Sequence, residues 1–334
     1  MPTEKDLEQS LFFANRVLKR DKHLRKWARK TGTDCYRVYD RDIPEVPLSL
    51  DRYGDAAVLY LYERPYDKPD DEEASWLELM AGAAASSLNI PRSALVVKTR
   101  RRLGVEDQYE RADAVGQDSG KNSGASRKTV ARERVVREND LSFIVNIDDY
   151  IDTGLFMDHR PAREMIGAMA SGKRVLNLFC YTGSFSVYAL AGGATHVVGV
   201  DLSNTYLTWA ERNIELNELG LERYRGVRAD VSAFLASEAA RGARYDLIIL
   251  DPPTFSNSKK MDGFLDVARH WPELVQACLA VLDPDGTVLF STNARGLKLD
   301  TALLPGARIV DISEKTIPED FRGHPHRTWL ITHA

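Results

Sequence analysis

The carboxyl-terminal half of the chain alternates short apolar runs with amphipathic stretches, and this alternation restricts the possible fold more than any other feature. Strands that alternate with helices build a parallel sheet covered by helices on both faces. Two last apolar runs, residues 307–312 and 328–332, have no full helix between them, which indicates an antiparallel edge strand. The other expected strands are residues 175–179, 196–200, 227–229, 245–250 and 288–292, and the clearest helices are residues 206–216 and 264–282. We therefore expect an α/β domain with a seven-stranded, mostly parallel sheet.

The amino-terminal part has a different pattern. Residues 7–30 place apolar side chains at helical spacing among basic ones, which predicts one or two basic amphipathic helices. Short β-branched or aromatic runs at residues 35–39, 48–53 and 58–62 predict a small antiparallel sheet, followed by a helix (72–88) and a strand (95–99). The domains expected are a basic helical segment (1–33), a small α+β accessory domain (34–103), a flexible polar insertion (104–140) and the α/β domain (141–334).

The composition is typical of a soluble globular protein, because the 334 residues are 43% hydrophobic and 28% charged. No apolar run approaches the roughly 20 residues that cross a bilayer. The amino terminus has no apolar segment behind a basic start, so we expect a cytoplasmic protein. The three cysteines, Cys35, Cys180 and Cys278, are widely spaced, so the sequence supports neither a disulfide framework nor a metal site.

Basic residues are concentrated in the amino-terminal half although the formal net charge is −4. One cluster lies between residues 16 and 30, a second between 98 and 102, and a third between 127 and 137. Each cluster alone could be a solvated face, but together they favour a polyanion such as RNA as partner. The residues expected to bind it are Arg16, Lys19, Arg20, Lys26, Arg29, Lys30, Arg100, Arg101, Arg102, Lys259 and Lys260.

Polar side chains end four consecutive strands of the predicted sheet. The first strand runs into the loop 177–184, and Asp201, Asp230 and Asp251 follow the next three. Each acid could be a helix cap or a turn residue, but ligands of open α/β sheets bind at these strand ends. Asp201 is placed to accept hydrogen bonds from a ribose, and Asp230 from an adenine amine. The loop has no G-x-G-x-x-G, so an adenosyl compound such as S-adenosylmethionine is favoured over a dinucleotide.

The segment 152–160, before the α/β domain, adds further polar groups. Arg160 could pair with the methionine carboxylate of this cofactor, and Phe156 could border its apolar part. The alternative is a helix start with Asp158 as the cap and Pro161 in the first turn, and both can be true. The expected cofactor-binding residues are Phe156, Asp158, Arg160, Asn177, Phe179, Tyr181, Thr182, Gly183, Asp201, Leu202, Ser203, Asp230 and Asp251.

The sequence Asp251-Pro252-Pro253-Thr254-Phe255 follows a buried strand and predicts a rigid shelf for a flat substrate. Such a shelf suits methyl transfer to a nucleobase nitrogen, whereas the alternative is a tight turn without chemistry. The chain resembles the guanine-N7 half of the bifunctional bacterial 23S rRNA methyltransferase, a class I methyltransferase. The motifs that carry this resemblance are residues 177–179, 181–184, 203–207, 209–213 and 251–259. Residues 13–16, 26–29, 35–37 and 51–53 are similar to the segment before that half.

This resemblance implies a Rossmann-like fold, S-adenosylmethionine as cofactor and methylation of N7 of a guanosine in 23S rRNA. It implies that Phe255 stacks on a flipped base, that Pro252 and Pro253 shape the slot, and that Asp251 bonds the guanine edge or orients the methyl donor. The substrate would be 23S rRNA or a precursor of the large subunit. Because the relative carries a guanine-N2 methyltransferase and a THUMP module upstream, a separate protein partner is also expected.

Three other functions stay open. A cytosine-C5 methyltransferase needs a thiolate, and Cys180 lies in the cofactor loop rather than beside Asp251. A guanine-N2 methyltransferase would share the fold and the cofactor. A ribosome assembly factor that binds RNA without catalysis would have no need of Asp201, Asp230 and Asp251.

Overall fold

The computed structural model describes residues 2–62, 69–100, 133–256, 265–294 and 296–334. These residues form two units, each with its own core. The first comprises the described residues up to Arg100, residues 133–153 and the short segment Glu319–Arg322. The second comprises the described residues of Gly154–Pro318 and Gly323–Ala334. The sequence placed the start of the α/β domain at residue 141, whereas the second unit starts at Gly154.

The first unit is a four-stranded sheet with two helices and a hairpin. Its elements are α1 (Glu4–Lys30), β1 (Cys35–Asp40), β2 (Leu48–Tyr53), β3 (Ala56–Tyr62), α2 (Asp70–Leu88), the 3-10 helix η1 (Arg92–Ala94), β4 (Leu95–Arg100), β5 (Glu133–Glu138) and β6 (Leu141–Asn146). The first three strands are antiparallel, as expected. The fourth strand, β4, pairs parallel to β3, because helix α2 connects the end of β3 to the start of β4.

Helix α1 is one continuous helix. Thr3 starts it with a capping box shared with Asp6, which satisfies free amides of the first turn. One stripe of the helix, which includes Phe13, Val17 and Leu24, is buried in the core of the first unit. The opposite side is free for charged residues, so the helix carries both the packing and the basic stripe.

The first strand of the hairpin β5–β6 and its turn fall in the region, residues 104–140, that the sequence assigned to a flexible insertion, whereas β6 falls in the expected α/β domain. The turn is formed by Asn139 and Asp140, which both adopt positive φ, as a two-residue hairpin turn requires. The amide of Asp34 donates to the carbonyl of Arg137 at 2.9 Å, which attaches the hairpin to the first unit. The insertion is therefore shorter than expected at its carboxyl end, and residues 101–132 lie outside the described residues.

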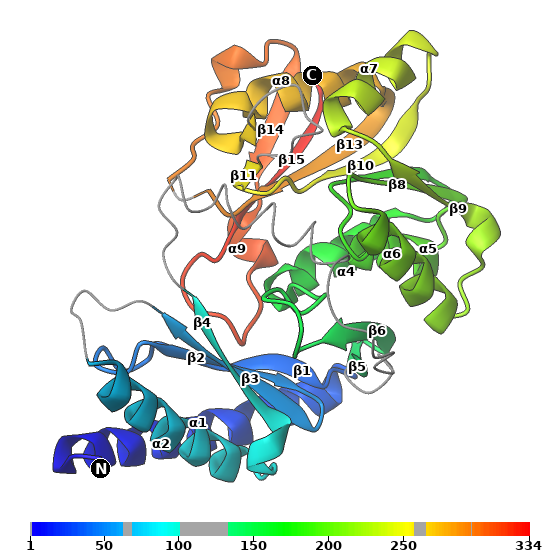
Figure 1. Ribbon diagram of the computed structural model, residues 1–334. Coiled ribbons are helices and arrows are strands. Elements are labelled where there is room, and N and C mark those ends of the chain that lie inside the picture. The colour runs from blue at the N-terminus through cyan, green and yellow to red at the C-terminus, as the bar shows by residue number, and fades with distance from the viewer. Residues whose placement is uncertain (1, 63–68, 101–132, 257–264, 295) are drawn as a thin grey trace, which may run out of the picture. The chain divides into compact units, whose positions relative to one another are not determined.

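The second unit is the α/β domain (Figure 1). Its strands are β7 (Arg174–Leu178), β8 (His196–Asp201), β9 (Tyr224–Arg228), β10 (Tyr245–Leu250), β13 (Leu282–Thr292), β14 (Ala307–Asp311) and β15 (Arg327–His333), with the short pair β11 (Phe255–Ser256) and β12 (Leu265–Asp266). Its helices are η3 (Met157–His159), α4 (Arg160–Met169), α5 (Ser184–Ala191), α6 (Asn204–Leu216), η4 (Leu221–Arg223), α7 (Val231–Ala240), α8 (Val267–Ala280), η5 (Thr301–Leu303) and α9 (Ser313–Thr316).

The seven-stranded sheet has the order β14-β15-β13-β10-β7-β8-β9. The strands from β9 to β13 are parallel, and β15 is antiparallel to both of its neighbours. The expected mostly parallel sheet is thus confirmed, with its antiparallel pairings at the expected edge. The reversed strand itself, β15, lies one position inside the edge strand β14. Helices α4, α5 and α6 lie on one side of the sheet and α7 and α8 on the other (Figure 1).

Burial on both faces explains the continuous apolar sequence of the central strands. The last four residues of β10, Leu247–Leu250, are all buried, and they pair with β7 on one side and β13 on the other. Because β7 and β10 are adjacent and parallel, their carboxyl ends meet at one edge of the sheet. The candidate site is built there.

Candidate active site at the strand ends

The loop after β7 is held in an unusual backbone conformation. Phe179, Tyr181 and Gly183 all have positive φ, at 54°, 49° and 74°. Gly183 has no alternative, because a Cβ there would lie 2.5 Å from the Cβ of Ala210. The Thr182 hydroxyl donates to the carbonyl of Gly154 at 2.6 Å and fixes the loop. Non-glycine residues in this region are strained, and such strain concentrates at ligand sites.

Asp201, the last residue of β8, organises this loop. Its Oδ2 accepts the amide of Tyr181 at 3.1 Å, and its Oδ1 accepts the amide of Ser203 at 2.8 Å. Burial raises the pKa of this carboxyl, and the two amides oppose the rise. A carboxylate has about four lone-pair sites, so both oxygens can still accept from ribose hydroxyls.

Aromatic rings gather beside Asp201. The ring of Tyr181 lies 5.3 Å from that of Phe156 and 4.6 Å from that of Tyr206, measured between centroids. The side chain of Phe156 remains partly exposed. These rings provide an apolar face next to an acceptor for hydroxyls, which is what an adenosyl group requires.

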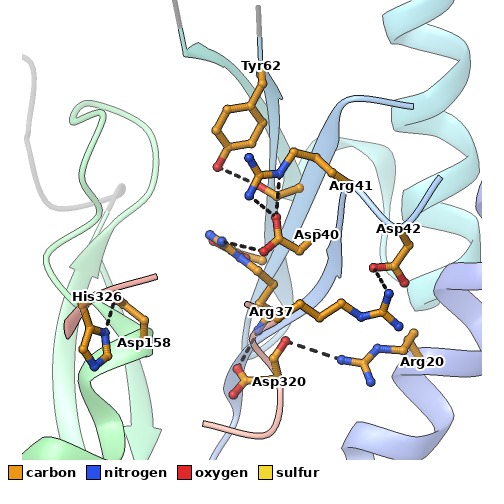
Figure 2. A network of polar contacts seen from close by, with 12 residues as sticks. Arg20, Arg37, Asp40, Arg41, Asp42, Tyr62, Asp158, Asp320 and His326 are labelled. Carbon is orange, nitrogen blue, oxygen red and sulfur yellow. Dashed lines mark hydrogen bonds and ion pairs between the residues drawn. The ribbon is translucent and has the colours of Figure 1, made fainter. Parts of the chain in front are cut away.

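A cluster of two acids and two histidines lies at the end of β10. His159 Nε2 is 3.5 Å from Asp251 Oδ1, and His159 Nδ1 is 3.5 Å from Asp158 Oδ2. His326 Nδ1 is 3.3 Å from the same Asp158 oxygen (Figure 2). The two imidazole rings are stacked, with centroids 4.3 Å apart.

The charges in this cluster are strongly coupled. Burial alone would lower the pKa of His159, but the carboxylates of Asp251 and Asp158 outweigh it and raise that pKa to about 10. Burial alone would raise the pKa of both acids, but the His159 charge overcomes it, and the pKa of each carboxyl is lowered. Burial and the charge of His159 lower the pKa of His326. These shifts favour a charged His159 between two ionised carboxylates and disfavour a second positive charge on His326.

The donor atoms of Asp158, His159 and His326 all lie within 4.8 Å of one another, which is close enough to consider a metal ion. The ring geometry fits this poorly. Imidazole lone pairs lie in the ring plane, and these two planes are stacked with an angle of only 22° between them, so they do not converge on one point. The geometry favours an ion-pair cluster.

The shelf predicted after β10 is present in its backbone. Asp251 is partly exposed, Pro252 is buried and Pro253 is exposed. The carbonyl of Thr254 accepts the amide of Val267 at 3.2 Å, which ties the shelf to the start of α8. Phe255 pairs with Asp266 through its backbone, and its side chain lies outside what the structure describes.

Other predicted cofactor residues lie around these two centres. Asn177 is 1% exposed and donates to the hydroxyl of Ser186 at 3.0 Å, so it joins β7 to α5. Asp230 caps α7 by accepting the amide of Ala233 at 2.9 Å. Arg160 is buried at the start of α4. The carbonyl of Leu202 accepts a hydrogen bond from the Nε of Arg228. The structure thus brings Asp158 and Asp251 together, and the loop residues with Asp201 and Ser203, while Asn177 has a supporting contact.

The predicted RNA-binding residues fall into two groups. Lys19, Lys26, Arg29 and Lys30 are exposed or partly exposed on α1. Arg16 pairs with Asp42, and Arg20 donates to the carbonyl of Asp320, so both have partners within the first unit. Of Arg100 only the backbone is described, and Arg101, Arg102, Lys259 and Lys260 lie outside the described residues.

Sequence reasoning missed three members of the site: His159, His326 and Ser291. His159 stands between two predicted residues and could have been found from its position. Ser291 lies on β13, and its hydroxyl is 2.9 Å from His159 Nε2. His326 is separated from Asp158 by 168 positions and carries no motif, so the sequence offers no signal for it.

Comparison with known proteins identifies the class. Residues 93–312 match the family described as S-adenosylmethionine-dependent methyltransferase. The structure of SMU.776, a putative methyltransferase in complex with SAH, superimposes with a TM-score of 0.74 at 22% identity, over 96% of this chain and 81% of that one. A methyltransferase from Agrobacterium tumefaciens superimposes with a TM-score of 0.54 at 20% identity, over 85% of this chain and 86% of that one. The chain is therefore an S-adenosylmethionine-dependent methyltransferase, with the fold of these enzymes.

Curated relatives narrow this class. Ribosomal RNA large subunit methyltransferase K of Neisseria meningitidis is 44% identical over 96% of this chain and 87% of its own length. Ribosomal RNA large subunit methyltransferase K/L of a Shewanella species is 41% identical, but the chain spans only 44% of its length. The K/L protein of Saccharophagus degradans is 43% identical, with 42% of its length covered. The chain belongs to the family of the ribosomal RNA large subunit methyltransferases K and K/L.

The site fits the cofactor of this class. Asp201 offers carboxylate oxygens beside the exposed ring of Phe156, and Arg160 lies buried at the start of α4. S-adenosylmethionine supplies an electrophilic methyl group when bound. No helix among the described residues is both long and apolar enough to span a bilayer.

Proposed function

We propose that this protein transfers the methyl group of S-adenosylmethionine to N7 of a guanosine in 23S rRNA. One arrangement supports this proposal most: the Asp251 carboxyl lies at the tip of a strand, next to Pro252 and Pro253 and 3.5 Å from His159, at the same sheet edge as Asp201. Burial alone would raise the pKa of this carboxyl, but His159 outweighs burial and lowers it. Family membership supports large-subunit rRNA as the substrate, since the relatives carry that name.

Methylation of guanine N7 requires that the base and the methyl donor be positioned, but it requires no general base. Guanine N7 has an in-plane lone pair that carries no proton at neutral pH, so no group needs to remove one. Methylation moves a positive charge onto the purine ring. An ionised carboxylate beside the base stabilises this charge as it develops, and it can also accept hydrogen bonds from the guanine edge. Asp251 fits both tasks.

Substrate capture is assigned to α1. Four of the predicted lysines and arginines on this helix, Lys19, Lys26, Arg29 and Lys30, are accessible to solvent. Exposed cations that release counterions from phosphates provide affinity without reading sequence. The proposed substrates are 23S rRNA and precursors of the large subunit. A separate RNA-binding or guanine-N2 methyltransferase protein is a further proposed partner.

The test is a product analysis. The protein is incubated with S-adenosylmethionine and unmodified 23S rRNA, naked and in large subunits, and nucleosides are identified by mass spectrometry. We expect 7-methylguanosine. The appearance of 5-methylcytidine or N2-methylguanosine would show a different base. No product from either RNA would favour a missing partner or an assembly factor.

The roles of the shelf residues are tested by a double variant. Asp251→Ala combined with Phe255→Ala should lose single-turnover activity, because the variant has neither the carboxylate nor the ring expected to stack on the base. A rate within a few-fold of wild type would reject the proposed roles.

Cytosine-C5 methylation has one specific candidate, Cys180. This residue is 5% exposed, and burial raises the pKa of its thiol well above the usual range, so a thiolate is disfavoured there. Cys180→Ser should therefore keep its activity, whereas a cytosine enzyme that used this thiol would lose it.

A further inference from the structure

The buried cluster around His159 has no counterpart among the roles above. Its four ionisable members come from separate parts of the second unit: Asp158 and His159 from η3, Asp251 from the end of β10, and His326 from the segment before β15. The side chain of His159 is 4% exposed and that of His326 is not exposed. Such a cluster is costly to bury unless its charges match.

We propose that His159 is a positioning residue, held as an imidazolium between Asp158 and Asp251, and that the stacked neutral His326 fixes the plane of its ring. The proposal rests on the proposed function in one respect, which is that Asp251 faces the methylated base. It assigns roles to two histidines that act through Asp251 and do not touch the substrate.

The positions of the two ring nitrogens of His159 indicate that the ring is charged. Nδ1 lies 3.5 Å from an oxygen of Asp158 and Nε2 lies 3.5 Å from an oxygen of Asp251. These are ion-pair contacts, because among the described residues Nδ1 has no hydrogen-bond partner and the hydrogen bond of Nε2 is with Ser291. Two carboxylates at this distance, one beside each ring nitrogen, stabilise a positive charge on the ring, so the geometry favours the charged form.

The surroundings of His159 carry the second step. Around the ring lie Ser291 of β13, whose hydroxyl is 2.9 Å from Nε2, and Phe185 of α5, which contacts it edge-on at 6.1 Å. The two acids and the stacked His326 complete the surroundings of the ring. A second cation at 4.3 Å would repel the first, so His326 stays neutral while it bonds Asp158.

The consequence concerns Asp251. Its Oδ1 is directed toward His159, and among the described residues no other contact engages this side chain, so Oδ2 is left for the ligand. The contact with His159 keeps the Asp251 carboxylate ionised and in one orientation. Both properties matter if the carboxylate is to stabilise positive charge on a base, because a protonated Asp251 would lose that ability.

The charge state is tested first, without any substrate. Carbon-13-labelled histidine in the full chain gives seven imidazole signals, which are followed by NMR from about pH 5.5 to 9. The signal that disappears in His159→Gln should have the shift of an imidazolium over the whole range. The signal that disappears in His326→Asn should titrate below the ordinary histidine pKa of about 6.5. A His159 signal that titrates near its ordinary pKa of about 6.5 would overturn the proposal.

The positioning role is tested by the pH profile of single-turnover methylation. His159→Gln keeps an N–H group but removes the charge, so the Asp251 carboxyl becomes easier to protonate. We expect a loss of roughly 10- to 100-fold at about pH 6 and of less than about fivefold at about pH 9. His196→Gln, at the start of β8 and hence at the opposite end of that strand from Asp201, is the matched control and should follow the wild type. A loss that is equal at every pH would reduce His159 to a structural residue and overturn the proposal.

Two further outcomes separate this proposal from others. If the wild-type protein methylates another base, the guanine-N7 proposal fails. The NMR result and the pH profile measured on that other product still test the role of His159. A chelator should change neither readout. A rate or a histidine shift that depends on an added divalent metal would overturn the ion-pair cluster in favour of a metal site.

Discussion

The two units both bury ion pairs, but they use different cations. In the first unit the guanidinium of Arg37 bonds both oxygens of Asp51 at 2.7 and 2.9 Å. The backbone amide of Arg37 donates to Asp320 (Figure 2). In the second unit the cation is His159. An arginine stays charged at every pH that a protein survives, whereas a histidine can lose its proton. The first network therefore fixes structure, and the second can respond to pH.

The network around Arg37 attaches the segment Glu319–Arg322 to the sheet of the first unit. The ring of Phe321 lies under the Arg37 guanidinium at 4.5 Å, and the buried carboxylate of Asp320 accepts from the Arg37 amide. Arg322 pairs with Asp42 at 3.2 Å. These contacts attach the segment Glu319–Arg322 to a strand residue that lies 283 positions before Asp320 in the chain.

The largest effect on stability is expected from Arg37→Ala. The change leaves the buried Asp51 without its cation, and removing one partner of a buried pair costs about 3–5 kcal/mol. Urea denaturation followed by circular dichroism would measure it. Arg92→Ala is the matched control, because Arg92 also makes a bidentate pair, with Glu78, but on the surface, where the loss is below about 1 kcal/mol. Equal losses would show that burial does not distinguish the two pairs.

The largest effect on activity is expected from Asp251→Asn. The amide keeps the shape of the side chain but removes the negative charge, so single-turnover methylation should fall on the order of 10²–10³-fold. The free energy of unfolding should change much less than in Arg37→Ala. Full activity in the Asp251→Asn variant would show that the charge at this position is not used.

Alkaline pH should separate the two units. The pKa of His159 is about 10 in the folded protein and about 6.5 when unfolded, so its contribution is full below about pH 6.5 and disappears as pH rises through about 10. We expect a loss on the order of 3 kcal/mol in the second unit between about pH 7 and about 10.5, and none from the Arg37 network. The difference between wild type and His159→Gln isolates this contribution. An identical pH dependence in both proteins would contradict it.

The smallest effect is expected on RNA affinity. Removing Lys26 and Arg29 together should lower the slope of log K against log salt by about 2, since each phosphate contact contributes about 0.9. Filter binding at several salt concentrations would measure the slope. Arg92→Ala again serves as the control. An unchanged slope would place the RNA elsewhere.

The sequence predicted the α/β unit well because its strands are continuous apolar runs, and an acid follows three of them. Asp201 and Asp251 were found in this way. The first unit was predicted less well: β4 is parallel because α2 brings it back, and an apolar run does not state its direction. Residues 133–140 were assigned to a polar insertion, although they form the first strand and the turn of a hairpin whose second strand is β6.

The site was only partly predictable for a similar reason. A motif shows which residues follow a strand, but it does not show which distant loop reaches them. Asp158 was expected to contact the cofactor, and the structure shows it between two histidines. His326 could not be placed before the fold was known, because only the order of β13, β15 and β14 brings its loop beside η3.

That order also has a consequence for synthesis on the ribosome. β15 fills the space between β13 and β14, yet it is the last strand of the sheet to be translated. Until it emerges, the hydrogen-bonding edges of β13 and β14 that it covers have no partner, and unpaired edges of apolar strands invite pairing with other chains. A pause in translation shortly before Arg327 should therefore increase aggregation of the nascent protein.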